Sequence, residues 1–328
     1  MFKRWLIILL QTGVTIGLLV FFFHDEKFRH EAWDALRQAD PRWLLLGVAI
    51  AGVENFLGVL RWRIFLRMLG MQVPFWKSLQ ICLVALFCNT FLIGAAGGDL
   101  VRMAWLIRRG FGKTDSLLSV IMDRVSGLGA LIVYTAVLCA WNYEWLMQSA
   151  TVVKMFAFVV AYQFAALLLI VVTLIISARG LTNRLPKWAP FPEFVRKLGA
   201  GYGRMFHEWP GTLKASGLSM VMMAAYFTVF WCTARAFGQG ISFIHLSALM
   251  PVADVISALP ISIGGLGVRE GTFVVMLGQL AGVPGAMAVS ISLIGYLVNV
   301  SWGLVGAAIL PFFKGIVHDA REAASAIR

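Results

Sequence analysis

Eight ionisable side chains interrupt or end long apolar stretches of this chain. If those stretches cross a bilayer, each charge costs about 2.5–3.5 kcal/mol on insertion scales, so each is a candidate functional residue. Arginine is the most informative type, because its planar guanidinium can bind a phosphate through two parallel hydrogen bonds. The arginines of the set therefore favour contact with an anion. The members of the set are Glu54, Asp99, Arg102, Asp123, Arg124, Asp254, Arg269 and Glu270.

The roles of these charges are open between two interpretations. Asp99 and Arg102 are three residues apart, so a helix places them on one face, where they can pair. Asp99 and Asp123 suit a structural ion pair and a contact with substrate equally well. For Arg102, Arg124 and Arg269 the guanidinium chemistry favours contact with an anion.

Two pairs of glycines end apolar stretches close to these charges. The first pair is Gly97 and Gly98, and the second is Gly264 and Gly265. Glycine permits a sharp turn and a close approach of the backbone to a ligand. A helix that starts after such a pair directs free N–H groups and its positive dipole end at the site, which favours an anion. We expect both pairs to contribute to binding.

The sequence carries no pattern that indicates covalent chemistry. The histidines have no metal-ligand spacing, and no nucleophile elbow, phosphate-binding loop or dinucleotide motif is found. The cysteines lie in apolar stretches and are predicted to be buried thiols. We therefore expect no catalytic residue, no metal site and no cofactor. The cysteines are Cys82, Cys88, Cys139 and Cys232.

The composition is typical of a membrane protein. Of the 328 residues, 60% are hydrophobic and only 13% are charged, whereas a soluble domain has about 25% charged residues. This excludes a soluble enzyme, a secreted disulfide scaffold and a disordered chain. The net charge of +12 could indicate a nucleic-acid partner, but a membrane protein carries the same excess on its cytoplasmic loops. No nucleic-acid partner is needed to explain it.

The apolar stretches predict an all-α polytopic membrane protein with about six full spans. A bilayer core needs about 20 apolar residues in a helix. Two further apolar stretches, Ser78–Leu100 and Leu246–Gly267, each contain a Gly-Gly pair and are predicted to be re-entrant helical hairpins. The six spans are Trp5–Phe23, Trp43–Leu60, Val125–Trp141, Met155–Ser177, Ala215–Ala234 and Ala286–Phe313.

The distribution of lysine and arginine predicts the orientation. If the N-terminus is inside and each hairpin leaves on the side where it entered, most of the 28 basic residues are cytoplasmic. Both termini are then cytoplasmic, and residues 178–214 form a cytoplasmic loop. The segment Pro186–Glu208 of this loop has two interpretations: an amphipathic segment that lies on an anionic leaflet, or a solvated loop. Arg61, Trp62 and Arg63 are expected beside lipid headgroups.

An internal repeat relates residues 43–113 to residues 215–281, within a single integral membrane domain of residues 1–328. The turns Arg67–Gly70 and Arg235–Gly238 share the pattern Arg-x-x-Gly, and the Gly-Gly segments share the pattern GGxxVR. In the expected topology the two hairpins open to opposite sides, so the repeat is inverted. Secondary transporters have this architecture, with the substrate near the midplane between the repeats.

Four motifs resemble the flippase-like transmembrane family typified by the membrane domain of lysylphosphatidylglycerol synthases, and the resemblance covers nearly the whole chain. Ala95-Ala96 stands where the first motif of the family usually has proline, and aspartate replaces its glutamate. The chain ends without an aminoacyltransferase domain, so the resemblance implies lipid translocation and not transfer of lysine. The motifs are Arg61-Trp62-Arg63, Gly97–Arg102, Asp123-Arg124 and Pro260–Glu270.

Together these features predict a protein of the cytoplasmic (inner) membrane that moves an anionic or headgroup-modified lipid between leaflets. The resemblance leaves the lipid open among phospholipids, hopanoids and polyprenol-linked glycans. Membrane lipids are the expected partners, with a separate lipid- or glycan-modifying enzyme as a further one. The alternatives are an intramembrane lipid-modifying enzyme and a non-transporting partner of a lipid or glycan synthase. No ATP site is found, so movement is passive or ion-coupled, with Glu54 and Asp254 as candidate proton carriers.

Overall fold

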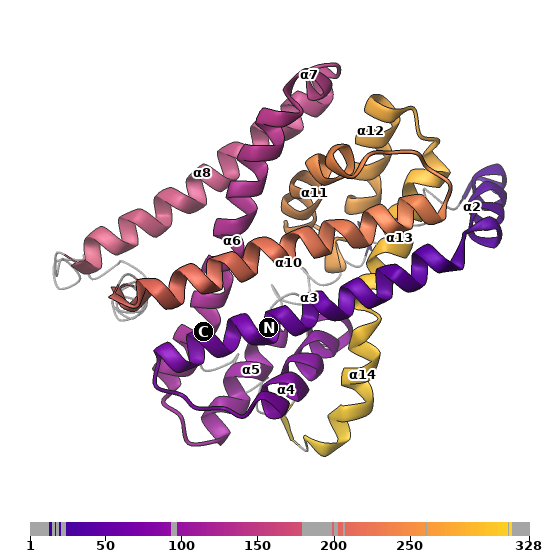
Figure 1. Cartoon of the computed structure of the whole chain (residues 1–328). Coiled ribbons are helices and arrows are strands. Elements are labelled where there is room, and N and C mark those ends of the chain that lie inside the picture. The colour runs from indigo at the N-terminus through magenta and orange to yellow at the C-terminus, as the bar shows by residue number, and fades with distance from the viewer. Residues whose placement is uncertain are drawn as a thin grey trace. The chain divides into compact units, whose positions relative to one another are not determined.

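The chain is helical throughout the part that the structure, a computed structural model, describes. In this part every regular element is a helix (Figure 1). The described residues are 24–92, 97–178, 203–205, 207–259, 261–313 and 315–316, with isolated positions 13, 14, 17, 20 and 199. The α-helices are α2 (Glu26–Gln38), α3 (Pro41–Met68), α4 (Phe75–Phe87), α5 (Gly97–Arg108), α6 (Lys113–Trp141), α7 (Tyr143–Leu146), α8 (Ala150–Ala178), α10 (Trp209–Ala236), α11 (Phe243–Ala258), α12 (Val268–Ala281), α13 (Gly285–Val300) and α14 (Trp302–Ile309).

Within the described residues, five helical segments are long and apolar enough to cross a bilayer. Each overlaps one of the predicted spans, which confirms an all-α, multi-pass membrane protein. The remaining predicted span, Trp5–Phe23, and the segment Pro186–Glu208 lie largely outside the described residues. Two shorter apolar segments, Phe75–Phe91 and Phe243–Ala258, fall in the predicted hairpin stretches. The five long segments are Pro41–Met68, Lys113–Trp141, Ala150–Thr173, Trp209–Ala236 and Gly285–Phe312.

The last predicted span is divided into two helices, α13 and α14, at Ser301. The hydroxyl of Ser301 donates to the carbonyl of Val298 at 2.7 Å, and the amide of Ser301 donates to the same oxygen at 3.4 Å. A serine hydroxyl competes with backbone amides for helical carbonyls, and this competition loosens the turn. The apolar pattern alone does not reveal this interruption.

α3 and α10 end in the same type of turn, at the two Arg-x-x-Gly segments of the sequence repeat. After α3, Gly70 has a φ of 75°, its amide donates to the carbonyl of Arg67, and the amide of Met71 donates to Leu66. Gly238, after α10, has a φ of 71° and an equivalent pair of hydrogen bonds. Such a cap needs a left-handed residue, which favours glycine. The two turns matched by sequence therefore share their local geometry.

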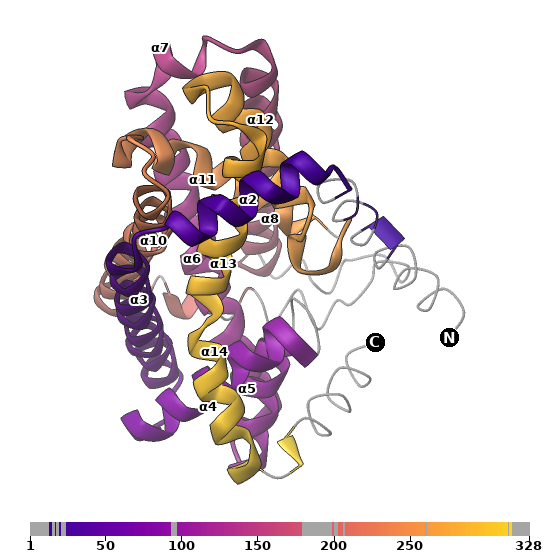
Figure 2. The same cartoon turned by 90° about the vertical axis from the view of Figure 1, so that its right-hand side faces the viewer.

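Packing divides the chain into two compact units. In unit 2, α4 packs against α5 and α14. In unit 1, α11 packs against α12, α12 against α13, and α13 against α2, which crosses it in Figure 2. Each unit thus contains one predicted hairpin stretch and the helix that follows it. Unit 1 comprises residues 1–52, 133–160 and 224–301, and unit 2 comprises residues 53–132, 161–223 and 302–328.

The second glycine of each Gly-Gly pair lies against the preceding helix. A Cβ atom at Gly98 would lie 2.6 Å from the carbonyl oxygen of Ala85, and one at Gly265 would lie 2.6 Å from the Cβ of Ser257. The first pair begins α5 and therefore belongs to a helical turn. Gly264 and Gly265 have φ values of 62° and 74°, so only the second pair forms a backbone break within the described residues.

Three glycine-to-alanine substitutions separate the steric cost from the backbone cost. A Cβ atom at Gly70 would have no neighbour within 4 Å, so Gly70→Ala costs only the free energy of placing alanine in the left-handed backbone conformation, about 1–2 kcal/mol. Gly98→Ala introduces only the steric clash with the carbonyl of Ala85, which is expected to lower the free energy of unfolding by about 1–3 kcal/mol. Gly265→Ala carries both and should destabilise most. Free energies of unfolding in mixed micelles test this order, with Gly129→Ala, which meets nothing within 4 Å on α6, as the neutral control.

Candidate functional site

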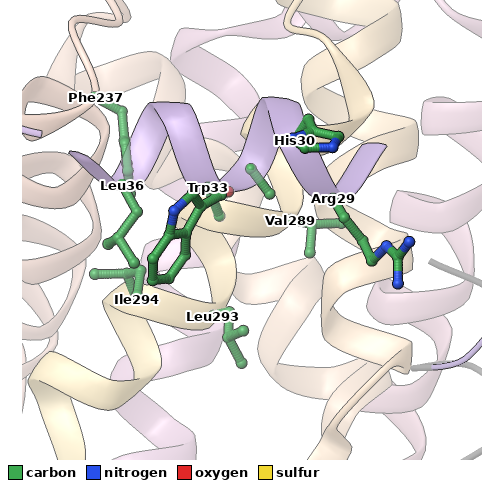
Figure 3. Close-up of a pocket in the computed structure, with 10 residues that line it drawn as sticks. Arg29, His30, Trp33, Leu36, Phe237, Val289, Leu293 and Ile294 are labelled. Atoms are coloured by element: carbon green, nitrogen blue, oxygen red, sulfur yellow. The ribbon is translucent and has the colours of Figure 1, made fainter. Parts of the chain in front are cut away.

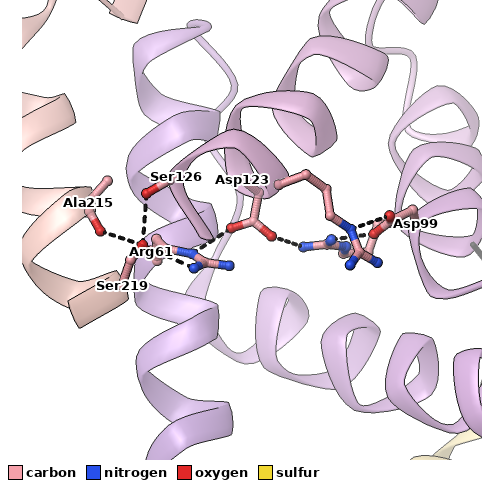
Figure 4. A network of polar contacts seen from close by, with 8 residues as sticks. Arg61, Asp99, Asp123, Ser126, Ala215 and Ser219 are labelled. Carbon is pink, nitrogen blue, oxygen red and sulfur yellow. Dashed lines mark hydrogen bonds and ion pairs between the residues drawn. The ribbon is translucent and has the colours of Figure 1, made fainter. Parts of the chain in front are cut away.

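Five ionisable side chains of unit 2 form one continuous chain of ion pairs (Figure 4). Asp123 accepts from Arg61 Nε at 2.7 Å through Oδ1 and from Arg102 Nη1 at 2.9 Å through Oδ2. Asp99 accepts from Arg102 Nη2 at 2.6 Å through Oδ1 and from Arg124 Nε at 2.7 Å through Oδ2. Each carboxylate thus bridges two guanidinium groups. We call these five residues the Arg–Asp cluster; with all five ionised it has one excess positive charge.

Three helices supply the Arg–Asp cluster. The i, i+3 spacing on α5 predicts the pair of Asp99 and Arg102, and the structure confirms it. Successive residues of a helix point about 100° apart. Asp123 and Arg124, neighbours on α6, therefore face different partners: Asp123 accepts from Arg61, and Arg124 donates to Asp99.

Arg61 of α3 is the cluster residue whose position the sequence interpretation had wrong. It was expected beside lipid headgroups together with Trp62, yet its side chain is 12% exposed and Trp62 is fully buried. Arg61 Nη1 also donates to Ser219 Oγ at 3.0 Å, and the Arg102 guanidinium lies 5.3 Å from the centre of the Trp62 ring. The reason is electrostatic: the buried carboxylate of Asp123 needs a second cation.

The Arg–Asp cluster lines a cavity of about 170 Å³ within unit 2. Glu54, Asn55, Asn89 and Gly98 line the same cavity, so it is polar on several sides. At about 30 Å³ per water in the liquid, it has the volume of roughly six water molecules. It can hold a phosphate-sized group.

Exposure of the side chains increases along the cluster from Asp123 to Arg124. The side chains of Asp123 and Arg102 are 7% and 12% exposed, whereas that of Arg124 is 59% exposed. Among the described residues, Asp99 is the carboxylate that accepts a hydrogen bond from Arg124, through Nε. Arg124 is therefore the cluster residue that an anion from outside can reach most directly.

The Arg–Asp cluster lies in a part of the chain that matches a known family. A family model described as the lysylphosphatidylglycerol synthase TM region matches residues 8–307. The chain belongs to this family. The resemblance stated from the sequence motifs is therefore confirmed, and the match spans both compact units.

Three proteins named UPF0104 membrane protein are similar to this chain over most of their length. One from Methanothermobacter thermautotrophicus is 25% identical over 316 residues, which is 88% of this chain and 90% of the relative. One from Archaeoglobus fulgidus is 21% identical over 79% of this chain and 82% of the relative. Another from M. thermautotrophicus is 24% identical over 73% of this chain and 74% of the relative.

The family region also contains a buried ion pair in unit 1, between Arg269 and Glu270 of α12. Arg269 Nη2 donates to Glu270 Oε1 at 3.1 Å, and the two side chains are 5% and 0% exposed. Ser292 Oγ donates to the same oxygen at 3.0 Å, and the amide of Gly267 donates to Oε2 at 2.5 Å. The Arg269 guanidinium lies 4.0 Å from the centre of the Tyr296 ring. These contacts make Arg269 part of a buried network of hydrogen bonds at the start of α12, which agrees with the structural ion pair that the sequence left open as an alternative.

The two candidate proton carriers lie in different units. Glu54 of α3 lines the cavity of the Arg–Asp cluster. Asp254 of α11 accepts a hydrogen bond from Tyr226 of α10 at 2.8 Å. Tyr226 was not among the predicted site residues, because a tyrosine in an apolar stretch gives no signal of its partner. Within the described residues, no group of three or more His, Cys, Asp or Glu side chains is placed to hold a metal ion.

A larger cavity of about 510 Å³ in unit 1 is mainly apolar (Figure 3). It lies between α2 and α13, and Trp33, Leu36 and Ile294 line it. In Figure 3 the guanidinium of Arg29 extends away from these apolar side chains. This cavity lacks the paired charges of the Arg–Asp cluster, so we place the candidate functional site at the cluster.

Proposed function

We propose that this protein moves an anionic or headgroup-modified lipid between the leaflets of the cytoplasmic membrane. One observation carries the proposal: a cluster with one excess positive charge lies in a polar cavity of a multi-pass membrane protein, with Arg124 at its accessible end. Ionisable residues within membrane proteins are retained where they serve a pathway or a binding site. Glu54 lines the same cavity, so a lipid phosphate that enters competes with carboxylates for the arginines.

The proposed step is an exchange of partners at Arg124. The phosphate binds the guanidinium of Arg124 and competes there with Asp99, while Arg102 keeps its bond to Asp123. In this proposal the headgroup enters the cavity and the acyl chains stay in the bilayer. The movement is passive or coupled to an ion, with Glu54 and Asp254 as the proposed proton carriers.

The proposal includes two re-entrant hairpins in an inverted repeat, with both termini in the cytoplasm. The matching turns after α3 and α10, and the close approach of Gly98 and Gly265 to the preceding helices, support it.

In a cysteine-free background, a cysteine at residue 188 or 320 should be labelled only from the cytoplasm, and one at residue 148 only from outside. Labelling of residues 148 and 188 from the same side would refute the proposed orientation.

A scrambling assay tests the function itself. The purified protein, reconstituted in vesicles with a fluorescent phosphatidylglycerol, should make inner-leaflet reporter accessible to a membrane-impermeant quencher, and protein-free vesicles should not. Mass spectra of the recovered lipid test the enzymatic alternative, because a lipid-modifying enzyme changes the mass of its substrate. An unchanged leaflet distribution with this and other anionic reporters would contradict the proposal.

Membrane lipids are the proposed partners, together with a separate enzyme that makes or modifies the transported lipid. The pairing is proposed because the matched family is named for a lipid synthase, and the match covers its TM region. Co-purification of a lipid- or glycan-modifying enzyme with the intact protein would support it. Transport at the full rate in cells that lack every such enzyme would contradict it.

A further inference from the structure

A second groove in unit 2 lies apart from the Arg–Asp cluster. It has a volume of about 730 Å³, and residues near the start of α4, the end of α5 and the turn Leu310–Phe312 line it. No residue of the Arg–Asp cluster is among its described lining residues. Phe312 is the last residue of the candidate span Gly285–Phe312. The groove is therefore located where this span leaves the bilayer.

The groove is strongly basic. Lys77, Arg108 and Arg109 line it, and no carboxylate is among its described lining residues. The Arg109 guanidinium lies 4.9 Å from the centre of the Trp105 ring, which also lines the groove. Lys77 is in the first turn of α4, which has no acidic residue and no side-chain cap. Because that end of a helix is already positive, a lysine there favours a bound anion.

The groove also has an apolar, aromatic side. Phe312 and Phe313 line it, and Phe312 is exposed. Trp76, next to Lys77 on α4, is exposed as well. Aromatic side chains are enriched where a protein crosses from the hydrocarbon core to the headgroups. A ligand that fits both sides has an anionic group joined to a hydrocarbon chain.

We propose that an anionic phospholipid binds in this groove, with its phosphate on Lys77 and Arg109 and an acyl chain along Phe312. This site is distinct from the cavity of the Arg–Asp cluster, since the two share no lining residue. The proposal goes beyond the proposed function and does not depend on it. A protein that transports nothing would bind the same lipid in the same place.

Native mass spectrometry of the purified full chain, titrated with phosphatidylglycerol or phosphatidylcholine in detergent, tests the site. Each basic residue near an anionic lipid is worth about 1 kcal/mol, so Lys77→Gln with Arg109→Gln should weaken binding of one phosphatidylglycerol about 30-fold. Binding of phosphatidylcholine should not change. The matched control is Arg67→Gln with Lys113→Gln, which removes two exposed cations of the same unit outside the groove and should leave both affinities unchanged.

Three outcomes would overturn the proposal. If the control variant loses as much affinity for phosphatidylglycerol as the groove variant, the lipid is attracted by the general positive charge of the unit and not by the groove. If Arg124→Ala loses this affinity and the groove variant does not, the lipid binds at the Arg–Asp cluster. The third outcome concerns the acidic residues Asp319 and Glu322, which lie outside the described residues. If they occupy the groove, the groove variant binds phosphatidylglycerol as the wild type does, and Asp319→Asn with Glu322→Gln binds it more tightly.

Discussion

Asp123→Asn is expected to lower the free energy of unfolding by about 3–5 kcal/mol, the largest effect of any single change in the Arg–Asp cluster. Asp123 is 7% exposed and accepts hydrogen bonds from both Arg61 and Arg102. Without the charge of Asp123, the guanidinium groups of Arg61 and Arg102 lose the carboxylate between them, and the cluster has two excess positive charges. Unfolding by sodium dodecyl sulfate in mixed micelles measures the difference from wild type.

A second substitution distinguishes the loss of charge balance from the loss of shape. Asp123→Asn with Arg61→Gln returns the cluster to one excess positive charge and should recover at least half of the lost stability. Asp123→Asn with Arg67→Gln, which removes an exposed arginine of the same helix as Arg61, should recover none.

Asp115→Asn is the matched single control. Asp115 pairs with Arg204 at 3.3 Å near the surface of α6, so its loss should cost less than about 1 kcal/mol. Equal effects of Asp123→Asn and Asp115→Asn would contradict this account of the cluster.

The parts of the fold and site that could be predicted from the sequence are those that depend on local patterns. Apolar length located the five long helical segments, and the Arg-x-x-Gly pattern located two equivalent caps, since both follow from rules acting over a few residues. The pair of Asp99 and Arg102 follows from the helical repeat in the same way. The division of the last span at Ser301 could not be predicted, because one hydroxyl causes it without changing the hydropathy.

Long-range partners could not be predicted. Arg61 joins the cluster through Asp123, 62 residues away, and the choice of that partner depends on how the helices pack. Ser292 and Tyr296, which also contact Arg269, are likewise distant in the sequence and could not be predicted. The ion pair of Arg269 with the adjacent Glu270 agrees with the structural interpretation that the sequence left open. A charge in an apolar stretch indicates that a partner is needed. It does not indicate whether the partner is the protein or the substrate.

The exposed fraction of each arginine separates these two kinds of partner, and transport measurements on Arg124 and Arg269 should differ accordingly. Arg124→Ala removes a half-exposed side chain, so unfolding should change by less than about 1 kcal/mol. Scrambling should nevertheless fall at least about tenfold, because a hydrogen-bonded contact with a charged group contributes about 1.5–3 kcal/mol. Arg124→Lys keeps the charge but loses the planar fork that matches phosphate, so it should impair scrambling nearly as much.

Arg269→Gln should show the opposite pattern, because its partner Glu270 is fully buried. The single change should destabilise the protein, and Arg269→Gln with Glu270→Gln should restore both stability and scrambling, since an uncompensated buried charge is the costly state. If Arg124→Lys and Arg124→Ala both scramble lipid at the wild-type rate, the phosphate does not bind at the accessible end of the cluster. If the neutral double at Arg269 and Glu270 folds stably but fails to scramble lipid, Arg269 contacts the substrate in addition to fixing the start of α12.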